Sequence, residues 1–181
     1  LDMSTSGVMV VSKTALATSA LGRQFQDRKT EKFYYAWVWG QVEKLEGTID
    51  LPLCVDWENR PRQQVNFEQG RRAITHYICL KVEADRSLMK LKPITGRSHQ
   101  LRVHMMELGH PILGDHLYAP PEAQAAAPHL YLHAAMLSFY HPISNQKLTF
   151  EAPAPFPLTA IPQKVRLPCP PPPCAAPSPP A

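Results

Sequence analysis

The chain has 181 residues, of which 44% are hydrophobic and 19% charged, and its formal net charge at pH 7 is +4. This length and composition are typical of one globular domain, and no apolar run approaches the ~18 residues of a membrane-spanning helix. The modest positive charge is compatible with a nucleic-acid partner but does not require one. The four cysteines lack CxxC spacing, which favours reduced thiols in a cytosolic protein over a disulfide scaffold.

In chain order, the hydrophobic patterns predict strands alternating with two helices. The expected elements are a buried strand over 7–11, a helix over 14–28, a strand over 32–40, a loop over 41–72, strands over 73–84 and 87–93, a short helix over 96–109, and strands over 129–142 and 147–153. Strands dominate and no repeat is evident. The sequence therefore predicts an α+β fold with a mixed, largely antiparallel sheet and few helices.

The stretch "KFYYAWVWG" is the strongest strand pattern. Its period of two places Phe33, Tyr35, Trp37 and Trp39 on one face and Tyr34, Ala36 and Val38 on the other. Tyr34 thus faces away from the aromatic stripe of its own strand. It is either a packed core tyrosine or a ring that stacks on a base and accepts a proton.

Proline is concentrated at the end of the chain, where 12 of the 20 prolines lie in residues 153–181. The run from Pro168 to Pro173 cannot form a helix or a central strand. We therefore expect a folded domain over residues 1–152 and a disordered or polyproline tail over residues 153–181.

The stretch "TGRSHQLRVH" gathers many hydrogen-bond donors: Arg97, His99, Gln100, Arg102 and His104. Arg97 lies at or just before the start of the predicted helix, where the positive end of the helix dipole disfavours a cation unless an anion meets it. On a helix, Arg97 and Arg102 diverge by about 140°, which predicts different partners for the two side chains. A solvated surface arginine is the alternative for Arg97.

Asp2 precedes Ser-Thr-Ser-Gly and an apolar run. It is either a turn residue or a carboxylate at a strand edge, available as a nucleophile or base. In the second case a cation within about 4–6 Å keeps it ionised, and Arg97 is the candidate.

Four loop arginines, Arg60, Arg62, Arg71 and Arg72, come from "NRPR" and "GRR" and either contact phosphates or form a solvated basic loop. The eight histidines show no ligand spacing such as HExxH, so we expect no metal site.

Together these stretches resemble the RluA family of pseudouridine synthases. The matching stretches are "LDMSTSG" for the family's catalytic aspartate, "KFYYAWVWG" for its tyrosine, "LKPITGRSHQLRVHMMELGHPILGDHLYA" for its arginine, and "LHAAML" for its later Leu-His-Ala segment. The resemblance covers about residues 1–152 and implies the pseudouridine synthase catalytic fold around a central RNA-binding cleft. In the family a His-Arg pair and earlier strands precede the position of Leu1, so we expect a chain shortened at its N-terminus.

The resemblance also implies an activity, the isomerisation of uridines to pseudouridine in structured RNA without cofactor or metal. Asp2 matches the nucleophilic aspartate, Tyr34 the active-site tyrosine, and Arg97 the arginine that pairs with the aspartate. His99, Arg102 and the four loop arginines are expected to contact phosphates. Within the family, "DWENRPRQQV" is most similar to the member that acts on both 23S ribosomal RNA and transfer RNA, so stem-loops of these RNAs are the expected partners of a monomeric protein with no membrane partner.

Two other classes of function are considered. A non-catalytic RNA-binding protein, or an inactive fragment on the same scaffold, would keep the basic loops and lose the chemistry. An unrelated aspartate-dependent hydrolase would need a second acid or a metal, and the sequence offers neither at a suitable spacing.

Overall fold

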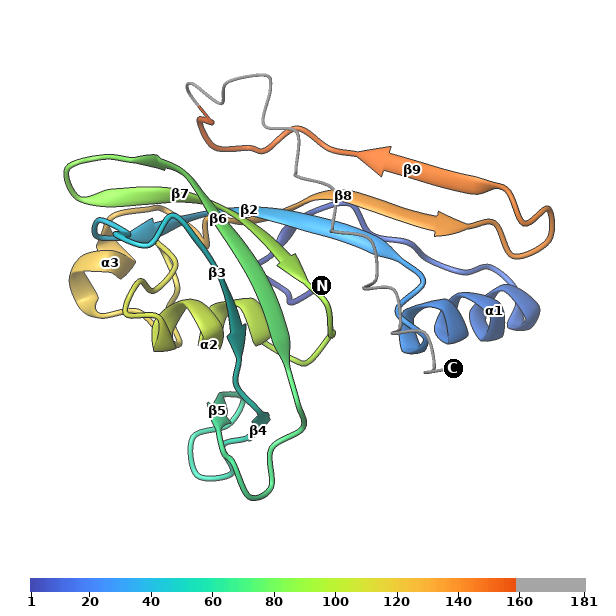
Figure 1. Ribbon diagram of the computed structural model, residues 1–181, viewed down its shortest axis with the longest axis horizontal. Helices are drawn as coiled ribbons and strands as arrows, with labels where there is room; N and C mark the ends of the chain where they lie inside the picture. The colour runs from blue at the N-terminus through green and yellow to red at the C-terminus, as the bar shows by residue number, and fades with distance from the viewer. Residues whose placement is uncertain (159–181) are drawn as a thin grey trace, which may run out of the picture.

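The computed structural model describes residues 1–158, and one twisted sheet carries the fold (Figure 1). The strands of the main sheet are β1 (Ser6–Gly7), β2 (Glu31–Trp39), β3 (Glu46–Asp50), β6 (Ile74–Val82), β7 (Arg86–Pro93), β8 (Leu132–Tyr140) and β9 (Lys147–Glu151), and a second, two-stranded sheet consists of β4 (Leu53–Val55) and β5 (Gln63–Val65). The helices of this part of the chain are α1 (Ala15–Gln26), α2 (Gln100–Glu107) and α3 (Pro121–Ala125). None of them is long and apolar enough to cross a membrane.

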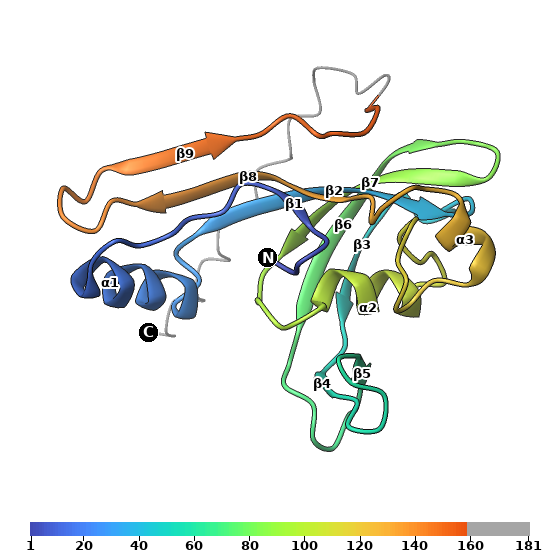
Figure 2. The ribbon, with the colours of Figure 1, turned by 180° about the vertical axis from the view of Figure 1, so that it is seen from behind.

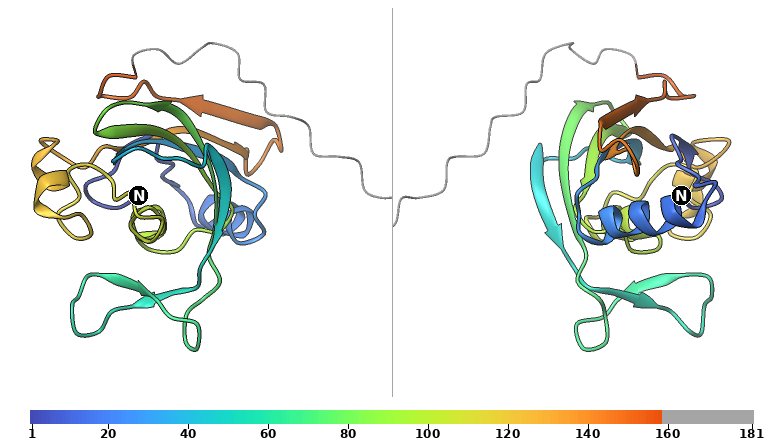
Figure 3. Two further views of the ribbon diagram at one scale, coloured as in Figure 1. Left: turned by 60° about the vertical axis from the view of Figure 1, so that its left-hand side comes forward. Right: turned by 90° about the vertical axis from the view of Figure 1, so that its right-hand side faces the viewer.

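The main sheet has the strand order β1-β8-β2-β7-β6-β3, and β9 also pairs with β8. Among these pairs, β1–β8 is parallel and the others are antiparallel. Helices α1 and α2 lie on the same side of the sheet, which curves around α2 (Figures 2 and 3). The predicted α+β class with a mixed, largely antiparallel sheet is therefore confirmed.

Strand β2 lies between β7 and β8, and its two faces belong to different cores. Ala36 and Val38 are buried with Leu101 and Met105 of α2, and Tyr34 packs against the same cluster. On the opposite face, Trp37 is buried with Leu88 of β7 and Phe156, and Tyr35 and Trp39 pack against that cluster. The predicted division of this strand is confirmed, and it turns Tyr34 toward α2.

Helix α1 begins after Thr14, whose hydroxyl accepts a hydrogen bond from the Ala17 backbone at 3.2 Å. This start agrees with the prediction of a helix over 14–28. Helix α2 begins only at Gln100, four residues later than predicted from the sequence, so residues 96–99 form a loop before it. Gly109 follows α2 with a φ of +87°, a conformation that glycine adopts readily, and it terminates the helix as predicted.

The predicted buried strand over 7–11 is wrong. Only Ser6–Gly7 pairs with β8, and Met9 and Val11 are 64% and 73% exposed. The cause is competition for the edge of β8, because β9 pairs with that strand from Met136 onward. A longer β1 would meet β9 at this point.

The predicted loop over 41–72 is also wrong in part, since it contains β3, β4 and β5. Strand β3 extends the main sheet by pairing with β6, whereas β4 and β5 pair with each other. The segment around β4 and β5 projects beyond the sheet (Figures 1 and 3), and we call residues 53–72 the arm. These strands have at most five residues and no run of alternating apolar residues, so hydrophobic periodicity gave no signal for them.

The boundary predicted at residue 152 is too early. Phe156 is 4% exposed and stacks on Tyr131 with a centroid distance of 4.9 Å, and the Trp37 indole donates a hydrogen bond to the Pro157 carbonyl at 2.9 Å. Residues 153–158 therefore belong to the folded domain. The rest of the predicted tail, residues 159–181, lies outside the described part of the chain.

Replacing Phe156 with alanine tests this assignment. We expect Phe156→Ala to lower the free energy of unfolding by about 3 kcal/mol, because it removes a buried ring and leaves a cavity against Trp37. Phe150→Ala is the matched control, since Phe150 is 47% exposed. Urea unfolding measures both variants, and equal, small losses would contradict the assignment.

A second prediction concerns pH and His104, which is completely buried. Its Nε2 lies 3.2 Å from the Leu51 carbonyl, which can only accept, so its Nδ1 accepts from the Thr75 hydroxyl at 2.9 Å. Burial lowers the pKa of His104 below its ordinary value, so the unfolded chain binds this proton more readily. Neutral His104 makes its full contribution to the free energy of unfolding above about pH 6.5, the ordinary pKa of histidine. This contribution is lost as the pH falls through the lower pKa that His104 has in the folded protein.

The measurement is urea unfolding at pH 7.5 and at pH 5.5. We expect His104→Gln to show a smaller loss of stability on acidification than the wild type, because glutamine keeps an amide donor without a titrating ring. His116→Gln, at an exposed position, should retain the wild-type pH dependence. Identical pH dependence in the wild type and His104→Gln would contradict the prediction.

Candidate active site

The loop that carries Asp2 is held against β8 by the residues that follow it. The Thr5 backbone donates a hydrogen bond to the Asp2 carbonyl at 2.9 Å, and the Ser6 hydroxyl lies 2.8 Å from His133 Nδ1. Gly7 has a φ of +112°, and a Cβ there would lie 2.2 Å from the Ala134 carbonyl oxygen. Only glycine fits such a close backbone approach, so the Ser-Thr-Ser-Gly stretch fixes the position of Asp2.

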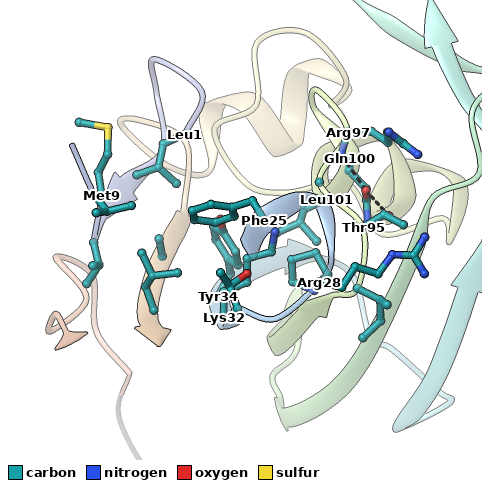
Figure 4. A pocket seen from close by; sticks show the side chains of 18 of the residues that line it. Leu1, Met9, Phe25, Arg28, Lys32, Tyr34, Thr95, Arg97, Gln100 and Leu101 are labelled. Atoms are coloured by element: carbon teal, nitrogen blue, oxygen red, sulfur yellow. Dashed lines mark hydrogen bonds between the residues drawn. The ribbon is translucent and has the colours of Figure 1, made fainter. Parts of the chain in front are cut away.

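A cavity of about 640 Å³ opens beside Asp2, a volume within the range of small-molecule binding sites (Figure 4). It is lined by the N-terminal loop, the end of α1, the start of β2, the loop between β7 and α2, and part of β8. Asp2, Tyr34 and Arg97, which the sequence nominated from three separate stretches, all line it. The structure therefore brings the three predicted catalytic residues to one site.

The predicted ion pair between Asp2 and Arg97 is wrong. Arg97 is exposed, and its Nε donates a hydrogen bond to the Arg72 carbonyl at 3.2 Å. The carboxylate of Asp2 instead faces Arg102, with 3.7 Å between Asp2 Oδ2 and Arg102 Nη1. The prediction failed because it placed Arg97 on the helix, whereas the helix begins at Gln100 and carries Arg102.

Arg102 is buried and has two carboxylate partners. Its Nε and Nη2 donate to the two oxygens of Asp115 at 2.8 and 2.6 Å, while Nη1 is the atom turned toward Asp2. Burial alone would lower the pKa of Arg102, but the hydrogen bonds and charge of Asp115, with the charge of Asp2, outweigh it and raise that pKa. The expectation that Arg102 contacts phosphate is therefore corrected, because its guanidinium is occupied inside the protein.

Asp115 is a functional position that the sequence analysis missed. Its side chain is fully buried, and besides Arg102 it accepts hydrogen bonds from the backbones of Leu117 and Tyr118 at 2.9 and 3.2 Å. The available signal was indirect. The predicted helix turned Arg102 about 140° away from Arg97 and so gave it a partner of its own, but no pattern in the sequence identified Asp115 as that carboxylate.

The Gln100 side chain fixes the loop that carries Arg97. Its Oε1 accepts hydrogen bonds from the Thr95 hydroxyl at 2.7 Å and the Arg97 backbone at 3.0 Å. Its Nε2 donates to the Ile74 carbonyl at 2.9 Å and to the Thr75 hydroxyl at 3.0 Å. The buried amide is fully satisfied, and it ties the start of α2 to β6.

Tyr34 projects into the cavity from the α2 face of β2 (Figure 4). Burial, with a smaller contribution from the negative charge of Asp2, raises the pKa of Tyr34 to about 12. Its phenol is therefore neutral near pH 7. It offers a ring face for stacking and a hydroxyl that can donate a hydrogen bond.

The side chain of His99 is held by Tyr118, which shortly follows Asp115 in the chain. The Tyr118 hydroxyl accepts from the Gln63 backbone at 2.8 Å and lies 2.6 Å from His99 Nδ1, so it donates its proton to that nitrogen. Burial lowers the pKa of His99 and is the largest effect; with a smaller contribution from the charge of Arg102, it outweighs the opposite effects of Asp2 and Asp115. His99 is neutral near pH 7 and keeps Nε2–H as its donor.

The four loop arginines belong to the arm, and none of them lines the cavity. Arg60 stacks over Trp57 with 3.8 Å between its guanidinium carbon and the ring centroid, and Arg62 lies 5.4 Å from the Tyr118 ring. Arg72 pairs with Asp50 at 2.7 Å, and Arg71 is exposed. The arm thus places its cations beside the site and not within it.

No group of three or more metal-ligating side chains occurs within residues 1–158. The chemistry that this arrangement offers is that of a carboxylate with a fixed counter-charge, next to an aromatic ring, in a cavity large enough for a nucleoside.

We predict that Asp115 supports the site through Arg102. Asp115→Asn should lower the free energy of unfolding by about 3 kcal/mol, because it leaves a buried guanidinium without its main partner. The exposed Asp85, replaced in Asp85→Asn, provides the control with the same chemical change. Thermal unfolding measures both, and an Asp115→Asn protein as stable as the control would overturn this role.

Comparison with known proteins identifies the family. The model described as RNA pseudouridylate synthase matches residues 1–107. The dual-specificity RNA pseudouridine synthase RluA of Vibrio cholerae is 56% identical over 156 residues, and that of Escherichia coli strain K12 is 55% identical over 157. Each match covers 86% of this chain, which spans 64% of the first relative and 72% of the second.

Solved structures agree with the sequence relatives. Human RNA pseudouridylate synthase domain containing 1 superposes with a TM-score of 0.75 at 31% identity, covering 86% of this chain and 67% of the human chain. Human RNA pseudouridylate synthase domain containing 4 superposes with a TM-score of 0.70 at 26% identity. The match covers 86% of this chain and 69% of the human chain. The predicted fold and the resemblance to RluA are confirmed, and the chain belongs to the RNA pseudouridylate synthase family.

Proposed function

We propose that this protein isomerises uridines to pseudouridine in structured RNA, with Asp2 as the nucleophile. The observation that carries the proposal is the placement of Asp2 beside buried Arg102, in the same cavity as Tyr34. Membership of the RNA pseudouridylate synthase family supports the same activity.

The reaction begins when the target uridine leaves its stack, because its glycosidic bond and C5 cannot be reached inside folded RNA. The cavity beside Asp2 then receives the flipped nucleoside. Asp2 acts at C1′ of the ribose as the N1–C1′ bond breaks. Arg102, itself held by Asp115, gives Asp2 a counter-charge and a fixed orientation, which lessens the reorganisation needed during the reaction.

The freed uracil then turns so that C5 faces C1′. A C5–C1′ bond forms as the sugar leaves Asp2, the C5 proton departs, and N1 gains a proton, so that product and substrate are isomers. Tyr34 supports the base through its ring. Because its pKa is raised to about 12, its neutral phenol relays a proton only by giving up its own as it receives one.

The arm and its neighbours are proposed to bind RNA outside the cavity. Arg60, Arg62, Arg71 and Arg72 would contact phosphates or stack on bases, and His99 would donate through Nε2. We propose stem-loops of 23S ribosomal RNA and transfer RNA as substrates, since the curated relatives carry "dual-specificity" in their names. We further propose that the protein acts in the cytoplasm as a monomer and without a cofactor.

The test is tritium release from stem-loop RNA labelled at uracil C5. The two substrates are a transfer RNA anticodon arm and a 23S hairpin. We expect release by the wild type and a loss of at least a thousandfold in Asp2→Asn, because the amide cannot act as the nucleophile. RNA binding by Asp2→Asn should stay within about threefold of the wild type, since phosphate contacts supply most of the affinity.

Asp85→Asn, on the β6–β7 connection, is the control and should release tritium at the wild-type rate. RNA binding without release by the wild type would favour the non-catalytic alternative. Equal loss of binding and release in Asp2→Asn would instead mean that Asp2 has a structural role.

A further inference from the structure

The cavity carries more positive charge than the proposed chemistry uses. Arg28, Lys32 and Arg97 line it, and Asp2 is the one carboxylate among its lining residues. Asp2 is already paired with Arg102, which is not a lining residue. We call Arg28, Lys32 and Arg97 the basic wall (Figure 4).

Lys32 is the innermost member of this wall, two residues before Tyr34 on β2. Its ammonium lies 5.7 Å from the centroid of the Phe25 ring and 3.4 Å from the position that a Cβ on Gly96 would take. Among the described residues no carboxylate lies within ion-pair distance of it, and burial lowers its pKa. A partly buried ammonium without a counter-ion is unfavourable unless a ligand supplies the negative charge.

Arg28 occupies an unusual backbone position at the end of α1. Its φ is +58°, in the left-handed region where helices commonly end with glycine or asparagine. Its backbone donates to the Phe25 carbonyl at 3.3 Å, and Lys29 donates to the Gln24 carbonyl at 2.9 Å, so this turn ends the helix. An arginine in this strained conformation, lining a cavity, indicates that its side chain is used.

Arg97 completes the wall from the opposite loop. Its position is fixed twice, by its backbone donating to Gln100 Oε1 and by its Nε donating to the Arg72 carbonyl. Within the described part of the chain its two Nη atoms have no hydrogen-bond partner, although they carry four donors. The structure removed its predicted role with Asp2 and leaves this guanidinium fork available to a ligand.

We infer that the basic wall binds a backbone phosphate of the RNA strand that carries the target uridine, next to the flipped nucleotide. A nucleotide whose base reaches Tyr34 and whose ribose reaches Asp2 must bring its flanking phosphates to the same cavity. Three cations without an internal anion match that charge, and an arginine fork suits phosphate oxygens. The inference rests on the proposed function, since it takes RNA as the ligand.

The experiment tests whether the loss of one protein charge and the loss of one phosphate charge have coupled effects on RNA binding. The RNA is the anticodon-arm stem-loop, with one phosphate near the target uridine at a time replaced by a neutral methylphosphonate. The proteins are full-length chains carrying Asp2→Asn, alone or with Lys32→Gln, Arg28→Gln or Arg97→Gln. Lys92→Gln is the control, because it removes the same charge from an exposed residue of β7 that does not line the cavity.

At one or two phosphates flanking the uridine, we expect the methylphosphonate to weaken binding about tenfold in the Asp2→Asn protein and in the Lys92→Gln control. In Lys32→Gln, the same replacement should change binding less than twofold, because the contact is already lost. In Arg28→Gln and Arg97→Gln, the methylphosphonate at the same phosphate should weaken binding by less than it does in the protein that carries Asp2→Asn alone. If the loss of binding from each protein substitution and the loss from each methylphosphonate simply add at every phosphate, the inference is overturned.

Two checks keep the outcome interpretable. Thermal unfolding of Lys32→Gln should match that of the wild type or exceed it, since the lysine has no internal carboxylate to lose, and Lys32→Arg should restore the coupling. Coupling without tritium release by the wild type would retain the phosphate site and reject the proposed function. Release without coupling would reject the phosphate site alone, and RNA binding by no variant would reject both.

Discussion

The buried ion pair between Arg102 and Asp115 is the interaction on which the site depends. Two charges removed from water are favourable only with good geometry and further hydrogen bonds, and here both conditions hold. The guanidinium and carboxylate meet through two short hydrogen bonds, and two backbone N–H groups satisfy the carboxylate further. The pair leaves one guanidinium nitrogen facing Asp2, so a core contact between α2 and the following loop sets the orientation of the proposed nucleophile.

Much of the fold followed from periodicity, and the site followed from motifs. The alternation along β2 correctly divided its residues between two cores, and this placed Tyr34 on the side of Asp2. The choice between Arg97 and Arg102 was beyond such an argument. It depends on where α2 begins, and Gln100 decides this by binding the Arg97 backbone with its side chain. Periodicity reports which face of a helix is apolar, but it does not report such a local competitor for the first turn.

The edges of the sheet were the least predictable part of the fold. Strand β1 stops after two residues because β9 occupies the next part of β8, and Phe156 joins the core by covering Trp37. Both outcomes depend on which distant segment reaches an edge or a face first in space. The apolar run over 7–11 favoured a longer strand, and the prolines after residue 152 favoured a tail, so the local patterns gave the wrong answer at both places.

The pairing of Ser6–Gly7 with His133–Ala134 has a consequence for synthesis of the chain. The proposed nucleophile is synthesised more than a hundred residues before the strand that positions it. During this interval Asp2 has neither its β8 support nor the Arg102–Asp115 pair, and contacts at such sequence separation form late in folding. The nascent chain therefore exposes its basic residues before its catalytic geometry exists, so any encounter with RNA at that stage is one of charge alone.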